Sequence, residues 1–136
     1  MRLEILERVS LILNNSNKFK HTYKNIVPIW TKVKKLPAVA VVNTHETTRR
    51  QDISSCRVKT DSVLDIYIYA KQTSSNSYDD VLSELITEVE TLINGDVELQ
   101  GMVVDCLVTG VKQDAGMLHP FAMAQLEVSI SYLKKV

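Results

Sequence analysis

Histidines, cysteines and clustered carboxylates are the residues of this chain that could perform acid–base chemistry or bind a metal ion. The three histidines, His21, His45 and His119, are far apart, and none has a second ligand at a metal-binding spacing such as HxxxH. The two cysteines, Cys56 and Cys106, form no CxxC pair and are expected to be reduced thiols, with Cys106 buried in its apolar run. These residues predict neither a metal site nor a cofactor site.

Acidic residues are concentrated in residues 78–93, where a helix is expected. Most of them lie outside the apolar stripe of that helix, so we favour a solvated helix face. A general acid–base pair would instead have to be buried. The sequence has no GxGxxG motif, no Walker-type phosphate loop and no GxSxG nucleophile motif. We therefore expect no enzymatic activity, and an enzyme with a site shared between subunits is the last-ranked alternative. The carboxylates concerned are Asp79, Asp80, Glu84, Glu88 and Glu90.

Charged residues are unevenly distributed along the chain, although the net charge is zero. Residues 1–60 contain twelve Lys and Arg against four Asp and Glu, whereas residues 61–136 contain four against twelve. Such halves could attract one another between copies of the chain, or their charges could cancel within one fold. The sequence pattern leaves both interpretations open.

Two basic segments are candidates for nucleic-acid binding. One extends from Lys18 to Lys35, and the other contains Arg49 and Arg50, with Arg57 and Lys59 nearby. The chain is not basic overall, however, and aromatic residues are not interleaved with these cations as base stacking would require. A basic rim that meets an acidic neighbouring copy is therefore favoured, and a small nucleic-acid-binding module is kept as an alternative.

The 136 residues, of which 45% are hydrophobic, are sufficient for one domain that spans residues 1–136. Apolar residues recur at helical spacing in residues 2–14 and, most clearly, in residues 78–93. Ser77 is a candidate N-cap of the second helix, and Asn94-Gly95 is a typical helix end. The stripe of this helix must pack on a sheet and comprises Tyr78, Val81, Leu82, Leu85, Ile86, Val89, Leu92 and Ile93.

Four segments have the composition or the alternation of strands, namely residues 38–43, 57–71, 102–112 and 121–133. Both faces of the first segment are apolar, which predicts a strand that is covered on both sides. The predicted fold class is therefore α+β, in the order α-β-β-α-β-β, with a single mixed or antiparallel sheet of about four strands and the helices packed on one face. The inward-facing residues are expected to be Leu64, Ile66, Ile68 and Ala70, and Ala122, Ala124, Leu126, Val128, Ile130 and Tyr132.

Two polar segments interrupt this pattern. Residues 18–37 are basic and contain prolines, and they are expected to form a surface excursion pinned by Ile26, Ile29 and Trp30. Residues 44–55 have no helical stripe and are expected to form a long hairpin connection or an extended arm. The tyrosines of residues 57–71 are expected to form a semi-polar outer face of the sheet.

The predicted sheet has two edge strands, which can pair with other chains unless they are protected. The final strand has no proline, and no lysine before Lys134. Opposite charges on the two halves of the chain would suit head-to-tail contacts, and such heterologous contacts close into a ring when the rotation permits. No apolar run is long enough for a signal peptide or a membrane span, so no membrane partner is predicted.

An ordered set of segments resembles a known family. It begins with Leu36-Pro37-Ala38-Val39-Ala40-Val41 and a polar arm, continues with LDIYIYA and SYDDVLSELITEVETLI, and ends with Asp114-Ala115-Gly116 and AMAQLEVSISY. This order is similar to the bacteriophage tail terminator family, typified by the minor tail protein U of lambda-like phages. The resemblance covers roughly residues 36–134 and the first helix, whereas residues 15–35 match poorly.

The resemblance implies a structural virion protein that forms a ring, expected to be a hexamer, on the head-proximal end of the tail tube. Such a ring stops tube polymerisation and offers an interface for head–tail joining, without a cofactor and without catalysis. The implied partners are other copies of the chain, the tail tube protein and the head–tail connector protein, in a virion tail assembled in the host cytoplasm. DNA would pass through the ring lumen without direct binding. Another head–tail connector or head-closure ring protein is the alternative.

Residue type and expected exposure indicate the surfaces through which such a ring would make contacts, because Arg, Met and aromatic residues are enriched at protein interfaces. The candidates for subunit or tube contacts are Arg49 and Arg50 on the polar arm, and Met117, His119 and Phe121 in the loop region after Asp114-Ala115-Gly116. Met117 and Phe121 could instead cover the end of the core.

Overall fold

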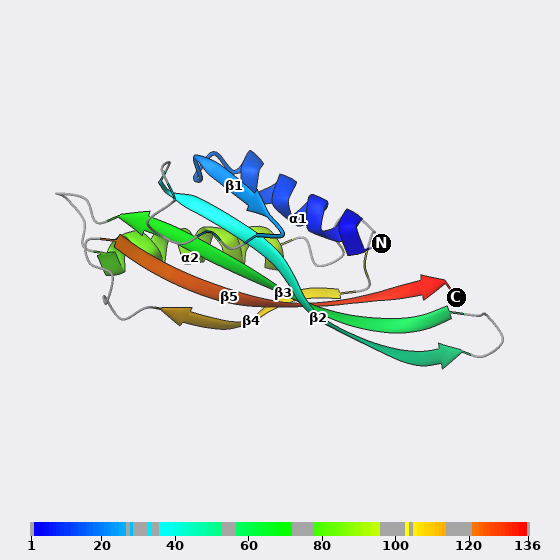
Figure 1. Ribbon diagram of the computed structural model, residues 1–136. Coiled ribbons are helices and arrows are strands. Elements are labelled where there is room, and N and C mark those ends of the chain that lie inside the picture. Colours follow the sequence, from blue (N-terminus) through cyan, green and yellow to red (C-terminus); the bar gives the residue numbers. More distant parts are fainter. Residues whose placement is uncertain are drawn as a thin grey trace.

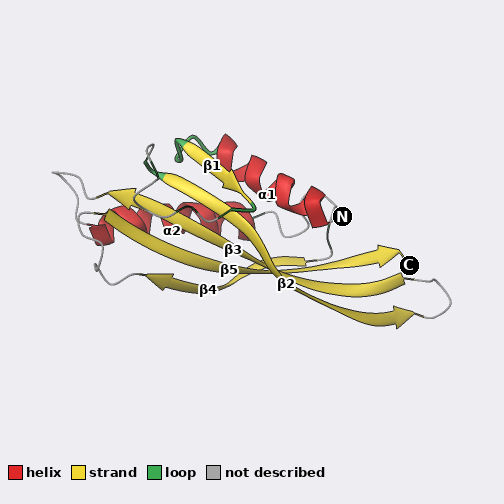
Figure 2. Ribbon diagram, viewed as in Figure 1, coloured by secondary structure: helices red, strands yellow, loops and turns green. Residues whose placement is uncertain are grey.

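The chain forms a mixed sheet with both helices on one face (Figure 1, Figure 2). The computed structural model describes residues 2–26, 28, 33, 36–52, 57–71, 78–95, 103, 105–113 and 121–135. In chain order the elements are α1 (Arg2–Asn15), β1 (His21–Lys24), β2 (Ala38–Asp52), β3 (Arg57–Lys71), α2 (Tyr78–Asn94), β4 (Asp105–Gln113) and β5 (Phe121–Lys135). The strand order is β1-β2-β3-β5-β4; β1 runs parallel to β2, and all other neighbours are antiparallel. The predicted α+β class is confirmed.

An additional strand, β1, explains why the described sheet has five strands where the sequence predicts about four. It lies in the segment predicted to be a surface excursion, and it pairs in parallel with residues 38–41 of β2. Two backbone hydrogen bonds fix its ends, from Lys20 N to Pro37 O at 2.7 Å and from Asn25 N to Val41 O at 2.7 Å. The segment HTYK has no apolar alternation, so its local pattern does not reveal the strand.

The chain that follows β1 is anchored differently from the prediction. Ile26 is predicted to pin this segment to the body, but its side chain is 58% exposed. Asn25 has a φ of 58°, a left-handed conformation that asparagine tolerates, and the strand ends there. Among the described residues that follow β1, Val33 is buried instead. Ile29 and Trp30, the other two predicted anchors, lie outside the described residues.

Both helices present an apolar stripe to the same face of the sheet, and the main core lies between the helices and this face. The predicted helix over residues 78–93 is confirmed. Most of its stripe is buried, whereas Val81 and Leu92 are half-buried; the buried members are Leu82, Leu85, Ile86, Val89 and Ile93. The helix ends where Gly95 N donates to Thr91 O at 3.0 Å, whereas the predicted N-cap Ser77 lies outside the described residues. From α1 the main core receives Ile5, Leu6, Val9 and Leu13.

The two central strands, β3 and β5, form the floor of this core. They pair over their full length, so that apolar residues of one strand lie opposite apolar residues of the other, as Ile66 lies opposite Leu126. Side chains on one sheet face alternate with those on the other, and the predicted inward sets of both strands are buried. Cys106 of β4 joins the same core and is fully buried, as predicted.

The opposite face of the sheet carries a second, smaller core at a place where the sequence predicts a semi-polar surface. Tyr69 is 2% exposed there and packs with Ala38, Ala40 and Val33. With Val39 and Val41 in the main core, this packing confirms that residues 38–41 of the predicted strand 38–43 are covered on both sides, whereas Val42 and Asn43 are half-buried. It also corrects the outer-face assignment of Tyr69. The tyrosine is accommodated because its Oη donates to Pro28 O at 2.9 Å.

Replacing Tyr69 with phenylalanine should lower the free energy of unfolding by about 1 kcal/mol at neutral pH, because the hydrogen bond to Pro28 is lost. Burial, followed by the nearby Tyr67 and Tyr23, raises the pKa of Tyr69 from 10.0 to about 12. The folded chain therefore keeps this proton at pH values where the unfolded chain loses it. The stabilisation is complete below pH 10 and is lost as the pH rises to about 12.

Urea denaturation of both proteins across this pH range measures the effect. The wild type should be more stable than Tyr69→Phe at neutral pH, and the difference should shrink as the pH rises from 10 to about 12. A difference that is constant across the range would show that the Tyr69 phenol is not protected by the fold.

Irregularities of the β-bulge type interrupt the strand register at three places in the described sheet, one of them at Gln51 of β2. Thr44 of β2 and Thr109 of β4 lie at shifts in the strand register. Each hydroxyl donates to a carbonyl of the facing strand, Thr44 Oγ1 to Val63 O at 3.2 Å and Thr109 Oγ1 to Glu127 O at 3.2 Å. Bulges increase the local twist of a strand, so the bulge at Thr44 helps to set the direction of the strands that continue beyond it.

Beyond the helices, three strands continue as a projecting arm (Figure 1). We define the arm as residues 44–52 of β2, 57–63 of β3 and 129–135 of β5. The polar segment predicted as a hairpin connection or an extended arm is thus paired strand as far as Asp52. β1 pairs with β2 only as far as Val41, and β4 pairs with β5 only as far as Ser131. Within the described residues, the outer edges of β2 in the arm and of the last residues of β5 therefore have no neighbouring strand.

Candidate assembly surface

Polar side chains at the base of the arm connect its three strands. Tyr132 Oη of β5 donates to Glu46 Oε1 of β2 at 2.6 Å, reaching across β3. On the other sheet face, Ser131 Oγ donates to Asp61 Oδ1 at 2.7 Å. Hydrogen bonds to a carboxylate are among the stronger ones in proteins. The arm is therefore tied across its strands as well as along them, and it can present its far end as a defined surface.

The predicted contact residues Arg49 and Arg50 lie towards the far end of the arm. Arg49 pairs with Lys59 of β3, and Arg50 pairs with Val58 of the same strand. On the other side of β3, Lys134 of β5 lies opposite Val58. Basic positions from three strands are thereby brought together, and one acidic position, Asp52 of β2, lies among them opposite Arg57. We call this set the basic end; it consists of Arg49, Arg50, Arg57, Lys59, Lys134 and Lys135.

Sequence reasoning missed the contribution of Lys134 and Lys135 to the basic end. The two lysines come from the end of the chain, and the arginines come from its first half. The available signal was the alternation of β5, which extends to the last described residues, but a local pattern does not say which strand is the neighbour.

The other predicted contact residues are not brought to the basic end. Phe121 begins β5 opposite Lys71, whereas Lys134 lies near the other end of the same strand. At about 3.3 Å per residue these two positions are roughly 40 Å apart. Met117 and His119 lie outside the described residues. The predicted contacts at Phe121 and at Arg49 and Arg50 therefore concern two separate surfaces, and both stay predictions.

The solvent side of α2 is acidic. Asp80, Glu84 and Glu88 follow one another at four-residue spacing, and we call these three residues the acidic stripe. Asp80 and Glu84 are exposed, as predicted, and Glu88 is half-buried. Like charges at this spacing repel one another on a helix surface. Lys18 Nζ lies 3.8 Å from Glu84 Oε1, but both side chains are largely exposed, and such a pair contributes at most about 1 kcal/mol.

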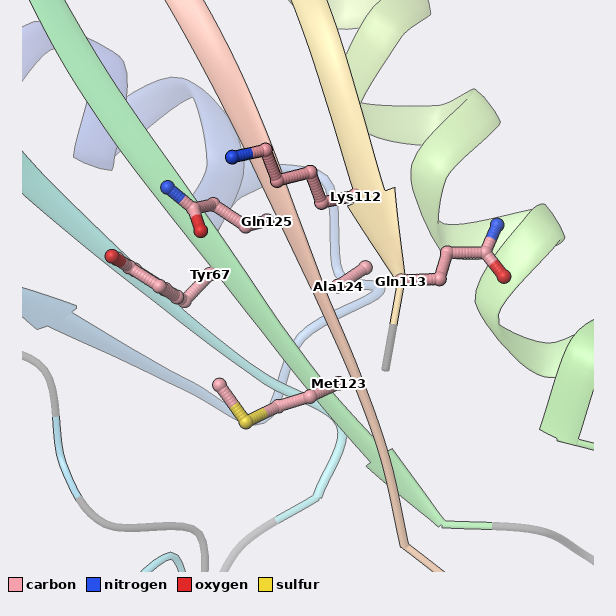
Figure 3. Close-up of a pocket in the computed structure, with 6 residues that line it drawn as sticks. All are labelled: Tyr67, Lys112, Gln113, Met123, Ala124 and Gln125. Atoms are coloured by element: carbon pink, nitrogen blue, oxygen red, sulfur yellow. The ribbon is translucent and has the colours of Figure 1, made fainter. Parts of the chain in front are cut away.

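A shallow hollow of about 190 Å³ lies across β3, β5 and β4 (Figure 3). Tyr67, Met123 and Gln125 lie on the side of the strands away from α2, whereas Gln113 points towards α2 (Figure 3). Burial, followed by the charge of Asp65, raises the pKa of Tyr67, so the phenol stays protonated at neutral pH. The described residues of the lining include no nucleophile with an adjacent base, and its tyrosine and methionine are typical of protein contacts.

Two observations concern metals and membranes in the part of the chain that the structure describes. There, no group of three or more His, Cys, Asp or Glu side chains is placed to hold a metal ion. Neither of the helices described is long and apolar enough to cross a membrane.

Comparison with known proteins assigns the chain to a family. The chain belongs to the bacteriophage tail tube terminator family, whose model matches residues 9–136. It is accordingly a structural protein of the phage tail and a component of the virion. The match includes residues 15–35, where the sequence pattern by itself shows little resemblance.

The fold has a counterpart in a solved virion. It is similar, with a TM-score of 0.54, to a chain in the structure described as the virion of a native gene transfer agent particle. The two chains are 9% identical, and the match covers 93% of this chain and 84% of that chain. At this identity the likeness establishes a shared fold. No curated protein sequence matches the chain significantly.

Proposed function

We propose that this protein assembles into a ring, a hexamer, on the head-proximal end of the tail tube. The ring stops further addition of tube subunits and offers the surface to which the head–tail connector binds. It acts by surface complementarity, without a cofactor and without catalysis. The family membership supports the role at the end of the tube, because the family is that of tail tube terminators.

The arm is the observation that carries this proposal. It projects beyond the helices, and within the described residues the outer edge of its β2 segment has no neighbouring strand. An open edge presents unpaired backbone N–H and C=O groups, which are satisfied when another chain binds. An arm of this kind on every copy provides a repeating contact, as a closed ring requires.

Addition of the purified protein to polymerising tail tube subunits should shorten the tubes. Each ring caps one tube end, so the mean tube length should fall as the ratio of terminator to tube protein rises. Electron microscopy measures the lengths and shows whether density is added at one end only. The mass of the free or tube-bound assembly should be about six times the 15.4 kDa of one chain.

Two results would contradict the proposal. Tubes of unchanged length, with the protein unbound, would remove the role as a terminator. A ring that binds the connector but not the tube would instead identify a head-closure protein, the alternative from the same class of assembly.

A further inference from the structure

The far end of the arm and the helix α2 lie in opposite parts of the molecule (Figure 1), and their residues carry charges of opposite sign. The basic end lies at the tip of the arm, with six Lys and Arg positions in paired strands. The acidic stripe lies on α2, which covers the other half of the sheet. Because the arm projects away from the helices, a chain cannot place its basic end on its own acidic stripe. Attraction between these two surfaces can therefore act only between copies.

A second acidic surface, on the sheet face away from the helices, is a weaker candidate for meeting the basic end. Its residues include Asp61 and Asp65 of β3. Asp61 already accepts a hydrogen bond from Ser131 at 2.7 Å, and Asp65 is 9% exposed. The side chain of Glu84 is 68% exposed. Asp80 and Glu84 of α2, both exposed, are therefore more accessible than these two carboxylates, whereas Glu88 is half-buried.

We propose that the basic end of one copy docks on the acidic stripe of α2 in the next copy of the chain. This inference rests on the ring proposed above and names the contact that closes it. The contact joins two different surfaces, so each copy both gives and receives one arm, which is the arrangement of a ring. The cations relieve the repulsion within the acidic stripe, and complementary charge fixes the orientation and speeds the encounter.

Charge reversal on each side, followed by recombination, tests this contact. Arg49→Glu with Arg50→Glu reverses charge at the basic end, and Glu84→Arg with Glu88→Arg reverses the acidic stripe. Each double variant alone should raise the concentration needed for half-assembly by at least about tenfold, because like charges then face one another. The chain with all four substitutions should recover most of the lost assembly. An equal mixture of the two double variants should recover it as well, because opposite charges face one another when the two variants alternate around the ring.

Matched controls separate this specific contact from a general effect of charge. Lys24→Glu and Glu7→Arg change the charge at exposed positions of β1 and α1, away from both surfaces. Each should change the half-assembly concentration by less than about twofold. Circular dichroism of every variant checks that it is folded, and analytical ultracentrifugation at low and at physiological ionic strength measures the assembly, which should weaken as salt rises.

The outcomes distinguish this contact from the proposed ring. Rings of normal stability from both double variants would overturn the contact while leaving the ring intact. The contact would likewise be overturned if the four substitutions together assembled no better than each double variant. A wild-type chain that stays monomeric both alone and on tail tubes would overturn the ring and the contact together. Unchanged assembly of Arg49→Glu with Arg50→Glu, together with loss of salt-sensitive retention on duplex DNA, would assign the basic end to nucleic acid instead.

Discussion

Replacing Leu126 with alanine should lower the free energy of unfolding by about 2–5 kcal/mol, the largest effect expected of the substitutions considered. Leu126 lies in β5, the strand between β3 and β4, and its side chain is fully buried beneath the helices. Truncation removes apolar surface from the core and leaves a cavity that two paired strands cannot easily close. Its neighbours in the ladder, Ile66 and Val111, are held by their own backbone hydrogen bonds.

Leu107→Ala provides a matched control, because it makes the same chemical change in the adjacent strand at a side chain that is 45% exposed. It should alter the free energy of unfolding by no more than about 0.5 kcal/mol. Urea denaturation, at protein concentrations where the chain is monomeric, measures the free energy of unfolding of both variants. Equal losses at the two positions would show that the main core is not where the structure places it.

Replacing Thr60 with valine should raise the free energy of unfolding, by about 1–3 kcal/mol. Thr60 of β3 is fully buried, and its Oγ1 has no hydrogen-bond partner within the described residues. A buried hydroxyl without a partner has lost its water without compensation, and valine has a similar volume without the polar atom. A β-branched residue also suits a strand.

Ser62→Ala is the control for this prediction, since Ser62 lies two residues away in β3 and is also buried. Its Oγ donates to Asn43 Oδ1 at 3.1 Å, so its removal should lower the free energy of unfolding by about 1 kcal/mol. Thermal and urea denaturation of the two variants should therefore shift in opposite directions. If Thr60→Val is also destabilised, the hydroxyl has a partner in solution.

Both predictions concern how firmly the arm is joined to the body. Leu126 lies in the part of β5 covered by the helices, and Thr60 lies within the β3 segment of the arm, opposite Tyr132. A contact made at the tip of the arm can orient a neighbouring copy only if the base is rigid. Substitutions at the base should therefore affect stability, whereas those at the basic end should affect assembly.

Regular patterns in the sequence were sufficient to predict the elements that bury one face. The stripe of α2 and the alternation in β3 and β5 predict the element type and the buried side chains, because these depend only on the repeat of the local backbone. β1 was missed, since its four residues have no repeat and the strand exists only because the backbone of residues 38–41 is available beside it.

The error in predicting the outer face of the sheet has a similar origin. Alternation placed Tyr69 correctly on the face away from the helices, but it could not indicate that Val33 and Leu36 would cover that face. Burial of Tyr69 requires a distant carbonyl, that of Pro28, to accept its hydrogen bond. A contact across this separation is not encoded in the spacing of neighbouring residues.

The sequence by itself determined the α+β class, the core side of each long strand, the α2 helix and the unequal distribution of charge between the two halves of the chain. Only the tertiary structure decided the strand order, the projection of the arm, and the meeting of Lys134 and Lys135 with Arg49 and Arg50 at one end of the sheet. The physical reason is that side-chain periodicity follows from the local backbone, whereas strand pairing depends on the packing of segments that are far apart along the chain.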